Sequence, residues 1–265
     1  MRPNRIRQLL ASGRPTIAAR TCSVWPDVVE IIGHTGLYDY VEFAAEYGPF
    51  DLHDLDNYCR AAELYGLGTM IKLDHDNREF LAQRAIGSGF QSVLFTDCRS
   101  AEEVRECVRI CRPDTPQDGG LFGAAARRFA YDESPRDKFS QALRDVVVAI
   151  MVEKQALVEQ LEEALSVPGV DLVQWGPSDW SMSSGFTGTR NSPELRAVER
   201  RVIETSLNMG VAPRIELESL DGVEYYLEMG VRHFRIGTDV AILRRFWKEN
   251  GAKLRDIVAK ACGQS

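Results

Sequence analysis

Asp179 stands in residues 174–181, a stretch that reads QWGPSDWS and could hold both a cation and an anion. The apolar run 170–175 before it predicts a strand, and a Gly-Pro pair ends that strand. A carboxylate directly after a strand can hold a metal ion, and free N–H groups at the start of a following helix can hold an anion beside it. The same stretch also fits a simpler role, in which Ser178 or Asp179 only caps the next helix.

Glu153 is a second carboxylate in a position where chemistry is expected. It ends the apolar run 146–152, which is typical of a strand buried on both faces. A carboxylate at the rim of a buried sheet needs a cation or hydrogen bonds. If the two strands are neighbours, Glu153 and Asp179 face one spot, and such a pair suits Mg²⁺ or Mn²⁺ with waters completing the coordination. In the simpler alternative, each carboxylate caps its own helix or pairs with a lysine.

Strand-like and helix-like segments alternate along the whole chain, which predicts a parallel sheet with helices between its strands. The expected strands are 16–21, 38–44, 70–73, 92–96, 146–152, 170–175, 212–217 and 233–237. The expected helices are 26–35, 51–65, 77–88, 100–111, 154–166, 193–209, 221–229 and 241–260. This pattern predicts a closed (β/α)₈ TIM barrel that spans 1–265 as a single domain. A doubly wound open sheet is the alternative, but the first strand-to-helix turn lacks the Gly-rich dinucleotide fingerprint.

Polar residues follow the expected strands, at the barrel end where active sites lie. They are Arg20, Glu46, Tyr47, Lys72, Asp74, His75, Asp97, Glu153, Asp179, Glu216, Glu218 and Asp239.

The chain resembles the HpcH/HpaI aldolase family over nearly its whole length. The resemblance rests on Glu153 after strand five, on GPSDWS at 176–181, on Glu46 and on RHFRIGTD at 232–239. It implies a metal-dependent pyruvate aldolase on a (β/α)₈ barrel, with an exchanged C-terminal helix and a hexameric assembly. It also implies that Glu153 and Asp179 bind the metal, and that the backbone around Ser178 receives the carboxylate of a 2-oxo acid.

This chain departs from the family pattern at the residues that transfer protons and at those that hold the oxo acid. The family signature Asp-Gly-Glu-His reads AAEY at 44–47, so Tyr47 replaces the acid/base histidine. Lys72 replaces an arginine that holds the oxo acid, keeping the charge but losing the planar fork. Met151 replaces a glutamine. Because the unperturbed pKa of tyrosine is about 10, Tyr47 is a poor base at neutral pH, although it can donate a proton.

Three further residues are candidates for the site. His75 could replace the missing histidine, or it is a solvated loop residue. Arg127 and Arg128 lie in the irregular segment 112–138 and could hold a substrate carboxylate, or they form a solvated basic pair.

Composition limits the partners that we expect. The net charge is -7 and no basic stripe is present, so nucleic acid is not an expected partner. No apolar run approaches the roughly 20 residues of a membrane helix. The 6 cysteines are scattered, which favours reduced thiols in a cytoplasmic enzyme. Apolar residues in the last helix predict a homo-oligomer, and the resemblance implies a hexamer or trimer of dimers.

The predicted function is a carbon–carbon lyase that acts on a 2-oxo acid through a pyruvate-like enolate held by the metal, with Lys72 adding positive charge. Metal-bound water, Tyr47 or His75 would transfer the proton, and Glu46 would contribute to substrate binding. Two alternatives remain open. One is decarboxylation or condensation on the same platform, and the other is a barrel that binds an oxo acid without catalysis.

Overall fold

A closed barrel of parallel strands forms the centre of the computed structural model, which describes residues 2–132, 135–189 and 192–263. The strands are β1 Thr16–Thr21, β2 Tyr40–Ala44, β3 Gly68–Leu73, β4 Ser92–Phe95, β5 Val147–Val152, β6 Leu172–Trp175, β7 Ala212–Leu217 and β8 His233–Thr238. Each strand pairs with the next one in sequence, and β8 returns to β1 with Thr16 opposite His233. The predicted (β/α)₈ barrel is therefore confirmed, because an open doubly wound sheet would leave these two strands unpaired.

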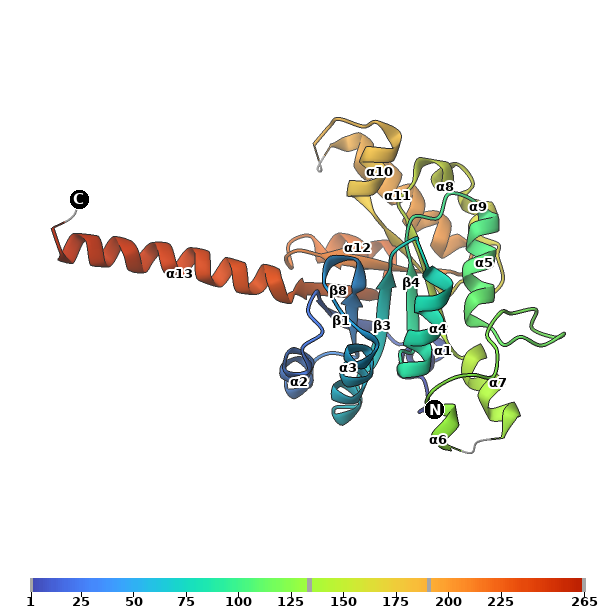
Figure 1. The fold of residues 1–265 in the computed structure, drawn as a ribbon. Helices are drawn as coiled ribbons and strands as arrows, with labels where there is room; N and C mark the ends of the chain where they lie inside the picture. The colour runs from blue at the N-terminus through green and yellow to red at the C-terminus, as the bar shows by residue number, and fades with distance from the viewer. Residues whose placement is uncertain (1, 133–134, 190–191, 264–265) are drawn as a thin grey trace.

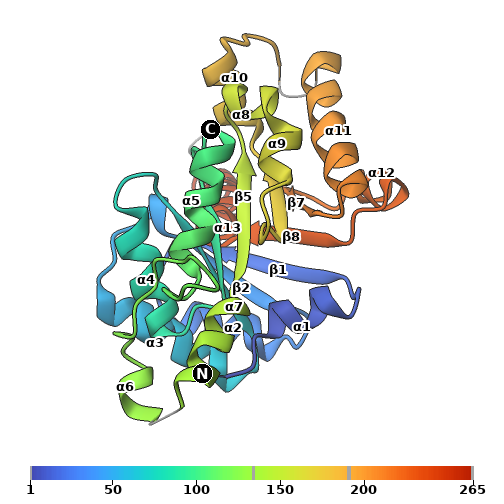
Figure 2. The ribbon, with the colours of Figure 1, turned by 90° about the vertical axis from the view of Figure 1, so that its right-hand side faces the viewer.

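Helices cover the outside of the barrel and connect its strands, except for the last helix, which extends away from the barrel (Figures 1 and 2). They are α2 Pro26–His34, α3 Leu52–Leu64, α4 Arg78–Ser88, α5 Ala101–Cys111, α6 Phe129–Asp132, α7 Arg136–Arg144, α8 Gln155–Glu159, α9 Leu161–Leu165, α10 Pro177–Ser184, α11 Pro193–Asn208, α12 Val223–Met229 and α13 Asp239–Ala261, with the short 3₁₀ helix η1 Ala45–Tyr47 after β2. The single helix expected at 154–166 is instead two, because the backbone of Gln160 turns out of the helical region between α8 and α9.

An additional helix, α1 (Arg5–Ala11), closes the amino-terminal end of the barrel. Asn4 caps it by accepting a hydrogen bond from the Arg7 N–H, and Ile6 is fully buried among apolar residues of the barrel interior. We did not expect this helix from the sequence, since seven residues carry too little periodicity.

The interior of the barrel is charged where β1, β2, β7 and β8 meet. Arg214 on β7 is fully buried, and its guanidinium donates to the Tyr40 hydroxyl at 2.7 Å and lies 2.5 Å from the Glu42 carboxylate. Burial alone would raise the pKa of Glu42, but Arg214, Arg20 and Arg235 outweigh burial and lower that pKa to about 2. Glu42 is therefore ionised at neutral pH, and the buried charges compensate one another.

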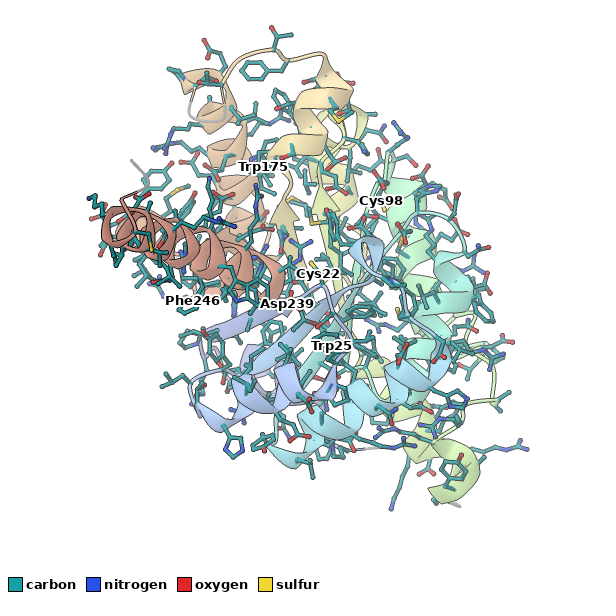
Figure 3. The ribbon with its side chains drawn as sticks, turned by 60° about the vertical axis from the view of Figure 1, so that its left-hand side comes forward. Cys22, Trp25, Cys98, Trp175, Asp239 and Phe246 are labelled. Atoms are coloured by element: carbon teal, nitrogen blue, oxygen red, sulfur yellow. The ribbon has the colours of Figure 1, made fainter. Side chains whose placement is uncertain are left out.

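The C-terminal helix α13 leaves the barrel and extends away from it (Figure 1). It begins at Asp239, whose carboxylate accepts hydrogen bonds from the backbone N–H groups of Cys22 and Ser23 beside it (Figure 3). None of its described residues is buried, and Phe246 and Trp247 are 61% and 65% exposed. The apolar surface that the sequence predicted for this segment is thus uncovered within one chain.

No described helix is long and apolar enough to cross a membrane.

Candidate active site

A cavity of about 500 Å³ lies at the carboxyl ends of the strands, where a TIM barrel places its active site. Five strands, β1, β3, β5, β6 and β7, contribute to its lining, together with residues of η1, α10, α11 and α12. Among the lining residues are Arg20, Tyr47, Lys72, Glu153, Ser178, Asp179 and Glu216. Glu153 and Asp179 follow the paired strands β5 and β6, so the structure brings them to one cavity as predicted.

Glu153 is a carboxylate that is almost removed from water, with 2% of the residue exposed. One carboxylate oxygen, Oε1, accepts a hydrogen bond of 2.9 Å from the backbone N–H of Asp97. Burial raises the pKa of Glu153 to about 7, because it outweighs that hydrogen bond and the attraction of Lys72, and Asp179 and Asp97 add to the rise. A nearby cation would favour the charged form of this group.

Gly176 makes room for the Glu153 carboxylate. A Cβ at position 176 would lie 2.6 Å from Glu153 Oε2 and 2.5 Å from Glu153 Cβ, which is closer than side-chain atoms approach. The glycine of the GPSDWS stretch therefore does more than end β6, since any larger residue there would displace the carboxylate.

Asp179 lies in the first turn of α10 but does not cap that helix. The N-cap residue is Gly176, and no side chain accepts a capping hydrogen bond there. Asp179 Oδ1 instead lies 3.3 Å from the Lys154 ammonium, which also contacts Asp97 Oδ1 at 2.5 Å. Of the two simpler alternatives for Asp179, capping is excluded and pairing with a lysine is observed.

Lys154 and Asp97 are functional candidates that the sequence did not single out as a pair. Asp97 stands after β4 with a positive φ of 60°, which turns its N–H toward Glu153. Lys154 follows Glu153 directly in the chain. Only the neighbouring positions of β4, β5 and β6 in the barrel show that Asp97 and Asp179 share this lysine.

The charges around the cavity fit a divalent cation. The basic lining residues are Arg20, Lys72, Arg196 and Arg214, and the acidic ones are Glu153, Asp179, Glu199, Glu216, Glu218 and Asp221. Within the described residues, no group of three or more His, Cys, Asp or Glu side chains converges to hold a metal ion by itself. A metal here would use Glu153 and Asp179, and water or substrate oxygens would complete its coordination.

Lys72 and Tyr47 form the neighbouring wall of the cavity. The Lys72 ammonium pairs with the Glu46 carboxylate, and this attraction outweighs burial and raises the lysine pKa. Burial also raises the pKa of Glu46 although Lys72 opposes that shift. Tyr47 is 59% exposed. The centroid of its ring lies 5.2 Å from the Lys72 ammonium and 4.8 Å from the Arg20 guanidinium. Tyr47 is therefore held between two cations.

The structure does not bring Arg127 and Arg128, the predicted substrate-binding residues, to this cavity. Arg127 lies 2.5 Å from Asp56 on α3, and Arg128 pairs with Glu63 near the end of the same helix. The segment that carries them packs with α6 and α7 near the N-terminus, at the opposite end of the barrel from α10 (Figure 2). The composition of this segment indicated a loop but could not indicate the end of the barrel to which it folds.

His75 does not reach the cavity. Its side chain is 46% exposed, its Nδ1 lies 3.4 Å from Asp76 of the same loop, and it is not among the described residues that line the cavity. The structure thus supports the alternative of a solvated loop histidine.

Comparison with known proteins identifies the chain. A model of the HpcH/HpaI aldolase/citrate lyase family matches residues 22–245. The chain belongs to this family. Membership confirms the resemblance seen in the sequence and the predicted class of enzyme, a carbon–carbon lyase of the HpcH/HpaI type.

Similar members of the HpcH/HpaI family include two aldolases and a solved structure. 4-Hydroxy-2-oxo-heptane-1,7-dioate aldolase of Escherichia coli is 26% identical over 91% of this chain and 91% of its own length. Hydroxypyruvate/pyruvate aldolase of Delftia acidovorans is 26% identical over 83% of this chain and 81% of its own. The crystal structure of a family protein from Burkholderia cenocepacia matches with a TM-score of 0.84 and 26% identity, covering 96% of this chain and 100% of that one.

Substitution of either carboxylate should abolish divalent metal binding without unfolding the barrel. Glu153→Gln and Asp179→Asn each remove one charged ligand at the cavity, outside the packed interior. In the unchanged protein, Mn²⁺ affinity should rise with pH up to about 7 and then level off, because protons compete for Glu153 below its raised pKa. Calorimetric titration with Mn²⁺ at pH 6 and pH 8 measures both effects.

Glu218→Gln is the control for these variants, since it removes a carboxylate from the same cavity but not from the proposed ligand pair. It should leave Mn²⁺ affinity nearly unchanged. Unaltered affinity in both Glu153→Gln and Asp179→Asn would exclude the metal site.

Proposed function

We propose that this chain is a lyase in which Glu153 and Asp179 hold Mg²⁺ or Mn²⁺, and in which a pyruvate-like 2-oxo acid binds beside them. The observation that carries the proposal is the burial of Glu153, whose pKa is raised to about 7, in the same cavity as Asp179. When bound, a divalent ion supplies Lewis-acid stabilisation of the negative charge that develops on the oxo oxygen. We further propose that residues 1–265 act together as one barrel domain.

The chain's own residues bind and orient the oxo acid. Backbone N–H groups around Ser178 and Asp179 lie in the first turn of α10, where a helix favours an anion, so they are suited to the substrate carboxylate. Lys72 is charged and buried beside the cavity, and Glu46 holds its ammonium in place. Lys72 thereby adds positive charge near the oxo group as the carbon–carbon bond breaks.

Tyr47 is our candidate for proton transfer. In aldol cleavage the substrate hydroxyl loses a proton, its oxygen becomes the aldehyde carbonyl, and the electron pair of the broken bond passes to the enolate of the oxo acid. A proton must then reach the enolate carbon. Tyr47 lines the cavity and is fixed between Arg20 and Lys72, so it is positioned to donate that proton.

A second candidate is a different reaction on the same platform, such as decarboxylation or condensation. The specific observation in its favour is that no histidine is among the described residues lining the cavity. Decarboxylation forms the enolate by loss of CO₂, so neither this reaction nor a condensation that starts from that enolate needs a base to remove a proton from the substrate.

We also propose that the protein is a homo-oligomer in which α13 exchanges between chains, as a hexamer or trimer of dimers. The support is the apolar surface of α13, where Phe246, Trp247, Leu254 and Ile257 are each more than half exposed. On the barrel, Ile17 of β1 is 45% exposed, although a strand of a closed barrel is normally covered by a helix. A helix from a second copy would cover such surfaces.

Tyr47→Phe should slow exchange of the methyl protons of pyruvate with deuterated water. NMR in the presence of Mg²⁺ follows the exchange, which needs only the metal, the oxo acid and a proton-transfer group. If Tyr47 transfers the proton, the rate should fall by about a hundredfold or more, while pyruvate affinity changes little.

Tyr226→Phe is a matched control, because its hydroxyl donates to Glu199 at 3.1 Å in the same cavity. That variant should exchange at nearly the unchanged rate. Equal rates in both variants would assign proton transfer to another group. No exchange in the unchanged protein, with pyruvate and metal bound, would favour the binding barrel or a reaction without proton abstraction.

Light scattering at micromolar concentration should show an oligomer. The double substitution Phe246→Glu and Trp247→Glu should yield smaller species, because it places charge in the apolar surface of α13. Lys248→Glu, a charge change at a residue beside them, should leave the assembly intact. A monomeric unchanged chain would contradict the proposed assembly.

A further inference from the structure

The charged part of the barrel interior carries more positive than negative side chains. Arg20, Arg214 and Arg235 come from β1, β7 and β8, and within the described residues they form ion pairs with two carboxylates, Glu42 and Glu216. The pKa of each of these carboxylates is lowered, because the arginines outweigh the effect of burial, so both are ionised. Among these five side chains, one positive charge is left over.

Other titratable groups near these five residues form no ion pair with the three arginines in the described part of the chain. Burial raises the pKa of the Cys22 thiol beside Arg20, and burial lowers the pKa of His233 beside Arg214 to about 4, so both are neutral at neutral pH. Asp239 lies near Cys22, but its two oxygens accept hydrogen bonds from the backbone N–H groups of Cys22 and Ser23 at 2.8 and 3.0 Å.

Arg20 is held less closely than the other two arginines. Its Nε lies 3.5 Å from Glu42 and its second contact, with Glu216, is also 3.5 Å. Charge-assisted hydrogen bonds are normally about 2.7–2.9 Å. Arg20 Nε is buried and has no hydrogen-bond partner among the described residues, but the same holds for Arg214 Nη2 and for Arg235 Nε and Nη2. The longer distances to its carboxylates are therefore what set Arg20 apart. In contrast, Arg214 lies 2.5 Å from Glu42.

Arg20 also shares the cavity with the candidate metal ligands. The Arg20 guanidinium and the Lys72 ammonium lie 4.8 and 5.2 Å from the centroid of the Tyr47 ring. The separation of the two cations therefore cannot exceed the sum of these two distances. Lys72 lies on the side of the cavity that holds Glu153, whereas Arg20 lies on the side that holds Glu216. One extended ligand can therefore meet both sides of the cavity.

We propose that Arg20 forms a second carboxylate subsite, which receives the far carboxylate of a dicarboxylic oxo acid whose other end lies at Glu153 and Asp179. The planar guanidinium matches a carboxylate, and a single negative charge balances the surplus positive charge. A doubly charged phosphate fits less well, because Glu42 and Glu216 lie beside Arg20. This inference rests on the proposed function for the position of the oxo-acid end.

The test compares two oxo acids of equal chain length, 2-oxopentanedioate and 2-oxopentanoate, which differ only in the far carboxylate. Calorimetry with Mn²⁺ present should show that the unchanged protein binds the dicarboxylate about tenfold more tightly, or more. Arg20→Gln should reduce this ratio to about one without weakening 2-oxopentanoate. Arg20→Lys, which keeps the charge but not the fork, should give an intermediate ratio.

Arg235→Gln is the matched control, because it removes an arginine from the same group of buried charges but does not line the cavity. It should destabilise the barrel as Arg20→Gln does, as measured by thermal unfolding, yet keep the preference for the dicarboxylate. Loss of the preference in both variants would show that general loss of buried charge, not a subsite at Arg20, explains the effect.

The remaining outcomes separate this inference from the proposed function. Equal affinity of the unchanged protein for the two oxo acids would overturn the subsite and leave the oxo-acid site standing. A further titration in EDTA, which removes the metal, uses pentanedioate, a compound with two carboxylates but no oxo group. Binding of pentanedioate that depends on Arg20, with no metal-dependent binding of either oxo acid, would support the subsite and overturn the metal-dependent function. No binding in any arm would overturn both.

Discussion

The burial of a single carboxylate, Glu153, constrains the whole active end of this barrel. Every residue of β5 is buried, so the side chain that follows the strand must enter a cavity with little water. An ionised carboxylate in such a place is costly unless a cation or hydrogen bonds compensate it. Asp97 donates a backbone N–H to the Glu153 carboxylate, and Gly176 leaves space for it. Asp179 adds a second negative charge nearby, which a bound cation would compensate together with that of Glu153.

The barrel interior is apolar in one part and charged in another. Apolar residues and the short helix α1 fill the amino-terminal end. Toward β1, β7 and β8, three buried arginines pair with Glu42 and Glu216, and both Arg20 and Arg214 line the cavity. Buried charges add little net stability compared with apolar packing. Their presence beside the cavity is better explained by ligand recognition than by stability.

Much of the fold could be predicted because strands that are covered on both faces consist of continuous apolar residues. The run 146–152 is the clearest example. The placement of Glu153 and Asp179 in one cavity followed from strand order alone. The contacts of Lys154 could not be predicted, since they depend on how the ends of β4, β5 and β6 and the turns after them lie side by side. The direction of the segment carrying Arg127 and Arg128 was also beyond the sequence, because its composition indicates irregular backbone but not the partners Asp56 and Glu63.

The most direct test of the account is the anomalous diffraction of crystals grown with Mn²⁺ and pyruvate. The account predicts a manganese peak bonded to both Glu153 and Asp179 at about 2.1 Å, with oxygens of pyruvate on the same ion. A manganese ion bound elsewhere, or pyruvate bound in this cavity with Lys154 still on Asp179 and no manganese peak, would contradict it.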